Sequence, residues 1–297
     1  MTNIFKVLAT VDRRVWYVII FFIIGIPLIR PVGLPIKVGD WTKNFYNHVE
    51  ALKPGDVVIV NFDIAAFGWD ELKAQTVAVC RHVFSKPGVK VIFMTDMAQG
   101  YVFIEKMIAM IGEPDNPEKP EFPWYTIEGK KYLVDYINIG YFAGRDVAIA
   151  ALSQDFRGYV GDTDWYGNKI DKWLDEVGIK NAGDIDVVIT FDCAGAQDWW
   201  VRHWYLTWKT VILNGQIGVS VPEAVPNYNA GMLKGLLAST RGAAEYEYLT
   251  GKPGMALIAM DAFSLIHLFL ILVIVLGNIG YFGWERKERR ARVFVGR

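Results

Sequence analysis

Two apolar segments flank a long middle region in which apolar runs alternate with amphipathic stretches. The segment from Ala262 to Trp284 has 23 residues without a formal charge, which gives a helix of about 35 Å, long enough to cross the hydrocarbon core of a membrane. The segment from Val15 to Ile29 gives only about 22 Å and needs flanking residues or a locally thinner bilayer. We therefore expect two membrane-spanning helices, over residues 15–30 and 262–284.

The apolar runs of the middle region, residues 31–261, are continuous and rich in β-branched residues, which is typical of strands buried on both faces. Amphipathic stretches between them indicate βα units and a parallel sheet. The pattern predicts a Rossmann-like α/β domain with about five units. After the fifth strand, NAGMLKGLLAS (residues 229–239) has small residues spaced by four and predicts a helix. The five expected strands lie within residues 55–63, 89–96, 132–141, 184–192 and 210–216.

Basic residues next to the two apolar segments predict the orientation of the chain, because Lys and Arg resist translocation. Lys6, Arg13 and Arg14 precede the first segment, and five of the residues from Arg286 to Arg292 are basic. We expect residues 1–14 and 285–297 to be cytoplasmic and residues 31–261 to lie in the periplasm or outside the cell. No small-residue cleavage pattern follows the first segment, so it is expected to remain as an anchor.

Charge and cysteine content narrow the function of the middle region. Residues 30–261 contain 22 basic and 29 acidic residues, whereas the whole chain has a net charge of −1. An acidic domain argues against a nucleic-acid partner, since a phosphate backbone requires a basic surface. Cys80 and Cys193 form no CxxC or haem-attachment motif, and Cys80 lies in an apolar helical pattern. We expect Cys80 to be buried rather than bonded to Cys193.

Candidate ligand-binding residues follow the predicted strands. In open parallel sheets, ligands bind outside the carboxyl ends of the strands. A carboxylate at this position can coordinate a cation, orient a sugar or an amine, or transfer a proton. The alternative interpretation is that each strand-end aspartate caps the next helix or turn. The candidates are Asp63, Asp96, Tyr141, Gly144, Arg145 and Asp192.

Established catalytic and cofactor motifs are absent from the sequence. Neither GxGxxG nor GxxxxGK[ST] follows a strand, and GxSxG and HExxH do not occur. We expect no cofactor, and a non-enzymatic role is favoured over an enzymatic one. Asp162 and Asp164 occupy the first and third positions of a calcium loop, but Tyr166 and Trp173 fill positions that need oxygen ligands. They are weak metal candidates, and a polar turn is the alternative.

Three further features suggest protein contacts. Prolines recur every third residue in the loop 113–124, the period of a polyproline II helix, and Pro117 and Pro120 lie at its centre. The stretch WWVRHWYLTW has more aromatic side chains than one sheet face is expected to bury. Glycines in the second apolar segment favour close helix packing. The interface candidates are Trp199, Trp200, Trp204, Pro117, Pro120, Gly277, Asn278 and Gly280.

The leading hypothesis from the sequence is a structural or assembly subunit of a membrane complex, in contact with lipid and present as a homo-oligomer or in a larger assembly. One alternative is a ligand-binding or sensory domain that uses the crevice at the strand ends, with a small ligand as its partner. Another is a hydrolase-like enzyme in which the aspartates act as acid and base. The βα pattern cannot separate them, because a fold class does not imply an activity.

Overall fold

The computed structural model describes residues 11–112, 129–193 and 195–295. The chain divides into two compact units. One unit combines Met1–Pro35 with Leu257–Arg297, and the other is the continuous stretch Ile36–Ala256.

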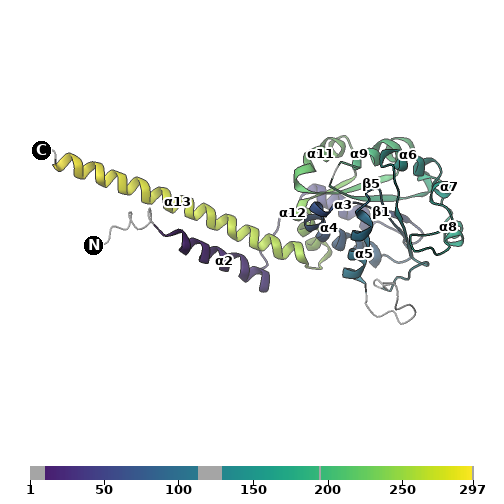
Figure 1. The fold of residues 1–297 in the computed structure, drawn as a ribbon, viewed down its shortest axis with the longest axis horizontal. Coiled ribbons are helices and arrows are strands. Elements are labelled where there is room, and N and C mark those ends of the chain that lie inside the picture. Colours follow the sequence, from purple (N-terminus) through teal and green to yellow (C-terminus); the bar gives the residue numbers. More distant parts are fainter. Residues whose placement is uncertain (1–10, 113–128, 194, 296–297) are drawn as a thin grey trace. The chain divides into compact units, whose positions relative to one another are not determined.

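The unit Ile36–Ala256 is built on a six-stranded sheet in which every pair of neighbouring strands is parallel (Figure 1). The strand order is β3-β2-β1-β4-β5-β6, so the chain changes direction across the sheet between β1 and β4. This confirms the prediction of a Rossmann-like parallel sheet and adds one strand to the expected five. The strands are β1 (Val57–Asp63), β2 (Lys90–Thr95), β3 (Tyr136–Tyr141), β4 (Val187–Asp192), β5 (Val211–Gln216) and β6 (Gly235–Ala238).

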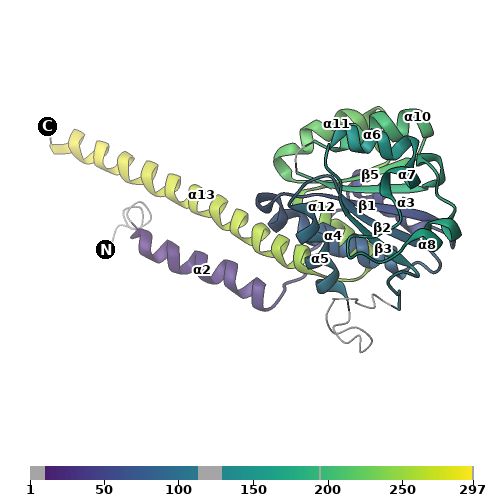
Figure 2. The same ribbon diagram turned by 45° about the vertical axis from the view of Figure 1, so that its right-hand side comes forward.

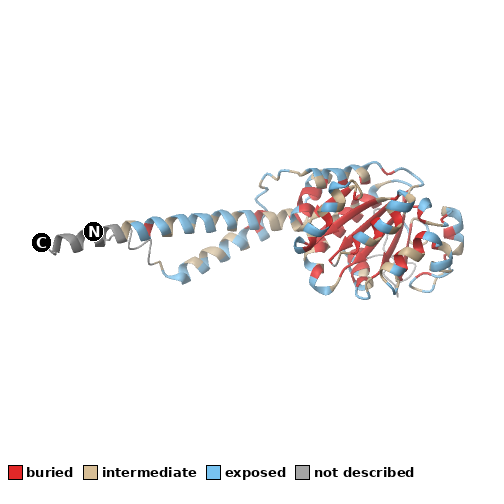
Figure 3. Cartoon of the chain, turned by 90° about the horizontal axis from the view of Figure 1, so that it is seen from above, coloured by how far each residue is buried: buried red, intermediate tan, exposed pale blue. Residues whose placement is uncertain are grey.

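Helices cover both faces of the sheet, and the strands between them are almost entirely buried (Figures 2 and 3). Each face has its own apolar core. One core contains side chains of α3 (Asp40–Glu50), α4 (Ala66–Ser85), α5 (Gly100–Ile111) and α12 (Ser239–Thr250). The other contains side chains of α6 (Asp146–Gln154), α7 (Phe156–Val160), α8 (Asp171–Val177), the helical run α9 (Gln197–Trp200), η2 (Val201–Tyr205) and α10 (Leu206–Trp208), and α11 (Val221–Asn229). The short 3₁₀ helices η1 (Ala182–Asp184) and η3 (Gly218–Ser220) complete the connections.

The predicted helix over residues 229–239 is wrong. Helix α11 ends at Asn229, Gly231 has a positive φ of 71°, and the chain then forms the edge strand β6 beside β5. A side chain at Gly235 would collide with the backbone of Phe45 in α3, with a Cβ placed 2.3 Å from the Phe45 Cα. The small residues at this spacing therefore serve a close approach between a strand and a helix, not a helical stripe.

In its described residues, 11–35 and 257–295, the second unit contains two helices, α2 (Arg13–Ile29) and all but the first two residues of α13 (Met255–Val295). The Trp16 and Phe269 rings lie 5.8 Å apart, and the Asp261 carboxylate accepts backbone N–H groups of residues 32–34 at 2.8–2.9 Å, so the two helices run antiparallel. Within α13, the stretch Met255–Trp284 is long and apolar enough to span a membrane, with a mean hydropathy of 2.5. It includes the predicted segment 262–284.

Both cysteines are buried and unbonded, as expected for Cys80. Cys80 packs in the core that α4 shares with the sheet, whereas Cys193 follows β4.

Candidate functional site

One face of the sheet changes from apolar to polar toward the carboxyl ends of its central strands. Strands β1, β4 and β5 are paired so that Ile59, Val188 and Ile212 form one transverse row on this face. The next row in the strand direction is entirely polar, and so is the last. These two rows consist of Asn61, Thr190 and Asn214, then Asp63, Asp192 and Gln216, all of them fully buried.

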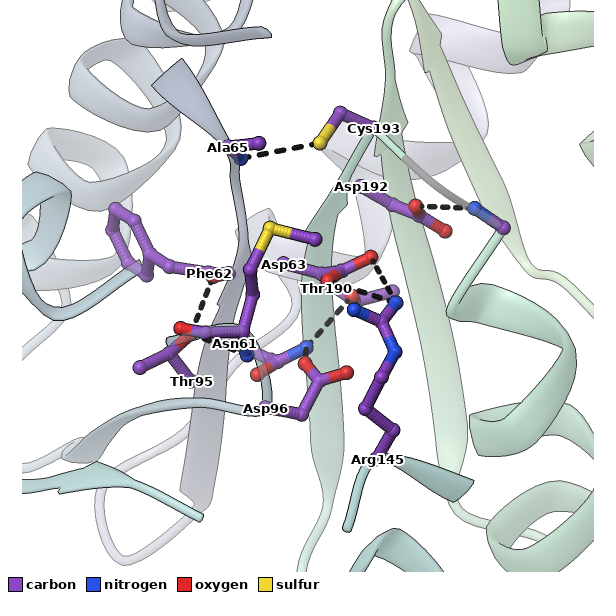
Figure 4. Close-up of polar contacts among 12 residues, drawn as sticks. Asn61, Phe62, Asp63, Ala65, Thr95, Asp96, Arg145, Thr190, Asp192 and Cys193 are labelled. Carbon is purple, nitrogen blue, oxygen red and sulfur yellow. Dashed lines mark hydrogen bonds and ion pairs between the residues drawn. The ribbon is translucent and has the colours of Figure 1, made fainter. Parts of the chain in front are cut away.

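The polar rows lie where the strand order reverses. Asp63 ends β1 and Asp192 ends β4, the two strands on either side of the switch point, and Asp96 directly follows β2. A switch point is the position at which open α/β sheets bind ligands. The structure thus brings together the three aspartates that the sequence selected, with at most 1% of each exposed (Figure 4).

Burial and mutual repulsion raise the pKa of two carboxyl groups in this cluster. The pKa of Asp63 is raised to about 9, chiefly because burial penalises its charged form, and further by the charges of Asp96 and Asp192. Burial also raises the pKa of Asp96. At neutral pH the Asp63 carboxyl group therefore carries its proton, and the group can donate a hydrogen bond as well as accept one.

Arg145 is the basic residue that faces the cluster. Its Nη2 lies 3.3 Å from Oδ1 of Asp63 (Figure 4). Its guanidinium carbon lies 4.6 Å from the centre of the Trp199 ring. Arg145 has a positive φ of 48° directly after Gly144, whose φ is 114°. A non-glycine residue in this region is strained, and such strain clusters at functional sites. The side chain is 37% exposed, so it forms the solvent side of the cluster.

Hydrogen bonding in the polar rows leaves acceptor atoms without donors. Asn61 Nδ2 donates to Oδ1 of Asp96 at 2.8 Å and to Oγ1 of Thr190 at 3.2 Å. Five buried oxygens have no hydrogen-bond partner among the described residues, and four of them belong to the polar rows or to Asp96; the fifth is Gln75 Oε1 in α4. A buried polar atom left unpaired costs about 1–3 kcal/mol. The four oxygens at the site are Asn61 Oδ1, Asp96 Oδ2, Asn214 Oδ1 and Gln216 Oε1. Gln197 contributes one unpaired donor, its Nε2.

Asp192 also acts as a cap, as the alternative interpretation expected. Its carboxylate accepts the backbone N–H groups of Gly195 and Gln197 at 2.7 and 2.8 Å and so fixes the loop that enters α9. Cys193 Sγ accepts the N–H of Ala65 at 3.2 Å and links this loop to the one after β1. Burial raises the pKa of the Cys193 thiol to about 11, so it is not a reactive thiolate at neutral pH.

Tyr141 and Gly144 frame the site from the β3 side. Tyr141 is the last residue of β3 and pairs with Thr95 of β2. Gly144 lies in the exposed turn that carries Arg145. Both help to place the Arg145 loop.

The weak calcium candidates form a polar turn. The Asp164 carboxylate accepts the backbone N–H groups of Tyr166 and Asn168 and the hydroxyl of Tyr132, which leaves it enclosed by donors. Oδ1 of Asp162 lies 3.6 Å from Nη2 of Arg157, and the Asp162 side chain is exposed. Among the residues that the structure describes, no three His, Cys, Asp or Glu side chains are placed to hold a metal ion.

The interface candidates differ in their surroundings. Trp200 and Trp204 are fully buried against each other and the sheet, so neither offers surface to a partner, and Trp199 is partly exposed beneath Arg145. Trp204 lies in the π-helical turn η2, and Trp200 is the residue that directly precedes this turn. In α13, Gly280 is buried and Asn278 is exposed, while Gly277 has open space around it. Pro117 and Pro120 lie outside the described residues.

Comparisons with protein-family models, with curated proteins and with solved structures found no match to this chain. The functional interpretation therefore depends on the geometry of the polar rows.

Proposed function

We propose that this protein is a membrane-anchored ligand-binding protein whose α/β domain holds a small, donor-rich molecule at the carboxyl edge of β1 and β4. The observation that carries the proposal is the set of four buried, unpaired oxygens beside three carboxyl groups. A ligand that brings N–H or O–H groups into these rows would satisfy them.

The hydrogen-bonding groups of the site favour an amine or a polyol over an anion. Three carboxyl groups and four unpaired oxygens can each accept a hydrogen bond, which an ammonium or a hydroxyl group can donate, whereas a phosphate or carboxylate group brings only acceptors. The loops after the strands also lack a glycine-rich phosphate cradle. We therefore expect polyamines, amino sugars or neutral sugars among its ligands.

Thermal-shift measurements on the full chain in mild detergent test this proposal. Amines and polyols should raise the melting temperature of the natural protein, and anions of similar size should not. Asp96→Asn should abolish the response, because it removes a carboxylate from the cluster. Asp70→Asn, which neutralises a side chain that is 90% exposed, is the matched control and should respond normally. A response to anions alone, or an unchanged response in Asp96→Asn, contradicts the proposal, and so does a flat result with every amine and polyol.

The proposal includes a membrane arrangement in which α2 is a second spanning helix. Its 17 residues give about 26 Å, slightly short of a typical hydrocarbon core, and it runs antiparallel to α13. Basic residues lie at the N-terminal end of α2 and in the C-terminal part of α13. This distribution supports a cytoplasmic position for residues 1–14 and 285–297, and an extracytoplasmic position for the domain.

Assembly into a larger complex is the second candidate function. Three large apolar side chains are exposed at the carboxyl edge of the sheet: Phe67, Val147 and Val219, at 72%, 73% and 83%. They begin the helical segments after β1, β3 and β5, and apolar side chains so placed fit a contact with another subunit.

Mass measurement of the full chain in several mild detergents tests assembly. The double variant Phe67→Ser/Val219→Ser should shift an oligomer to the monomer, and Lys172→Ser, on the exposed side of α8, should not. A monomer in every detergent rules out the homo-oligomer.

A further inference from the structure

A cavity of about 490 Å³ lies in the α/β domain on the face of the sheet opposite the polar rows. Its walls come from α3, α4, the end of α5, α12 and the segment that leads into α13. The cavity is therefore separate from the carboxyl-edge site, and a ligand bound at that edge does not fill it.

Three basic side chains line this cavity: Arg81, Lys86 and Lys252. Two acidic side chains line it as well, and both are held by protein groups. Glu50 accepts from Lys86 and from His82 at 2.8 Å, and Glu247 accepts the backbone N–H groups of Gly254 and Ala256. The surplus charge of the cavity is positive, which favours an anionic group.

The Arg81 guanidinium is the basic group least committed to the protein. Among the described residues, it has one hydrogen bond, a long one of 3.4 Å to the carbonyl of Met110. A guanidinium with most of its donors unused is well suited to a phosphate group.

His82 forms a rigid and uncharged part of the wall. Its Nδ1 lies 2.7 Å from the Tyr246 hydroxyl, its Nε2 bonds to Glu50, and the Tyr46 ring stacks on it at 5.0 Å. Burial lowers the pKa of His82, so it stays neutral at pH 7, while bonds from Lys86 and His82 lower the pKa of Glu50 to about 2. Because both ring nitrogens are engaged, this histidine supports the wall and does not act as a base.

Another part of the lining is apolar and consists of Val77, Ala78, Met110 and Met255. An occupant that matches both parts carries an anionic group on one side and a hydrocarbon portion on the other. Small soluble anions match only the basic part.

The cavity also lies close along the chain to the apolar helix. Met255 lines the cavity and is the first residue of α13. Asp261 comes six residues later, about 9 Å of helical rise, and the uncharged stretch 262–284 follows it. This rise is close to the thickness of the headgroup layer, which holds the phospholipid phosphates next to the hydrocarbon core.

We propose that this cavity binds the phosphate-bearing headgroup of an anionic membrane phospholipid, with Arg81 and Lys252 at the phosphate and the apolar part of the lining along the glycerol and upper acyl chain. This site is independent of the ligand at the carboxyl edge, but it rests on the membrane position of α13. A lipid held here would fix the domain at the membrane surface.

Native mass spectrometry of the full chain in mild detergent tests the proposal, with phosphatidylglycerol, phosphatidylcholine, diacylglycerol and glycerol 3-phosphate as probes. Phosphatidylglycerol should bind at least tenfold more tightly than the other three. Arg81→Gln/Lys252→Gln should lose this preference, whereas Lys131→Gln/Lys172→Gln, which removes two exposed charges elsewhere, should keep it. Ala78→Phe retains every charge but fills the cavity, and it should also exclude the lipid.

Several results would overturn the proposal. Equal loss in the two double variants would mean that only overall charge matters, and full binding in Arg81→Gln/Lys252→Gln or in Ala78→Phe would place the lipid elsewhere. Glycerol 3-phosphate binding as tightly as phosphatidylglycerol would identify a soluble phosphate ligand instead. Release of the chain from membranes by alkaline carbonate would show that α13 is not inserted in the bilayer, and the proposal depends on this insertion. Asp96→Asn should leave lipid binding unchanged, so the two proposed sites can fail separately.

Discussion

The Asp63 carboxyl group ends a strand inside the protein, with the carboxyl groups of Asp96 and Asp192 beside it. In the unfolded chain an aspartate titrates near pH 4, whereas in the folded protein the pKa of Asp63 is about 9. Between these values the folded state binds more protons than the unfolded state. The free energy of unfolding should therefore fall as the pH rises through this window.

The substitution Asp63→Asn should remove this dependence. The amide is nearly the same size as the protonated acid but does not titrate, so the variant should gain stability relative to the natural protein as the pH rises from 5 to 8.5. One such group contributes up to about 1.4 kcal/mol per pH unit. Thermal unfolding of the full chain, followed by circular dichroism across this range, measures the difference. The stability of the control Asp70→Asn should change with pH in the same way as that of the natural protein. If the stability of Asp63→Asn also follows the natural protein, Asp63 is ionised in the folded state.

Individual residues of the site could be predicted to different degrees. Asp63, Asp96 and Asp192 were predictable, because each follows an apolar run and parallel strands end at one edge. Asn61, Thr190 and Asn214 were not, because their row exists only once the register of three strands is known. Arg145 was selected as part of a turn, but its hydrogen bond to Asp63 depends on how that turn folds back over the sheet.

At the level of elements, β6 depends on one close approach. A methyl group at Gly235 would lie 2.3 Å from the Phe45 Cα and 2.5 Å from its backbone nitrogen, so α3 and the edge strand would have to separate. Gly235→Ala should destabilise the domain by about 3 kcal/mol, the upper end of the range for overpacking, because the colliding atoms belong to backbone.

Melting of the full chain by tryptophan fluorescence measures this effect. A loss of about 3 kcal/mol corresponds to a fall of about 6–12 °C for a domain of this size. Gly277→Ala, where the added methyl group meets nothing within 4 Å, should leave the melting of the α/β domain unchanged. If Gly235→Ala melts like the natural protein, α3 does not approach β6 this closely.

Sequence patterns identified most elements because long β-branched runs and amphipathic periods carry strong signals. They failed at β6, because this strand has only four residues, two of which are small, and so shows no strand period. They also gave no sign of the π-helical turn η2 or of the burial of Trp200 and Trp204 at this turn. Both features arise from contacts between distant parts of the chain, which a local pattern does not contain.

For the whole molecule, the membrane arrangement makes a prediction about two positions, one in the α/β domain and one after the apolar stretch. Lys172 lies on α8 of the α/β domain, and Arg286 follows the apolar stretch of α13. If the domain is outside the cytoplasm, a membrane-impermeant maleimide should label Lys172→Cys in intact cells but label Arg286→Cys only after permeabilisation. The buried Cys80 and Cys193 should contribute little background. If only Arg286→Cys is labelled in intact cells, the α/β domain is cytoplasmic.

The contact at Asp261 has a consequence for how the molecule can be taken apart. Its carboxylate holds the backbone of residues 32–34, just before the α/β domain begins at Ile36, and Asp261 itself follows the end of that domain at Ala256 by five residues. The domain therefore enters and leaves the helical unit at one point, like an insert in a host protein. A short linker between residues 256 and 36 should allow circular permutation, and a short loop in place of the domain should leave a helical hairpin that can be produced separately.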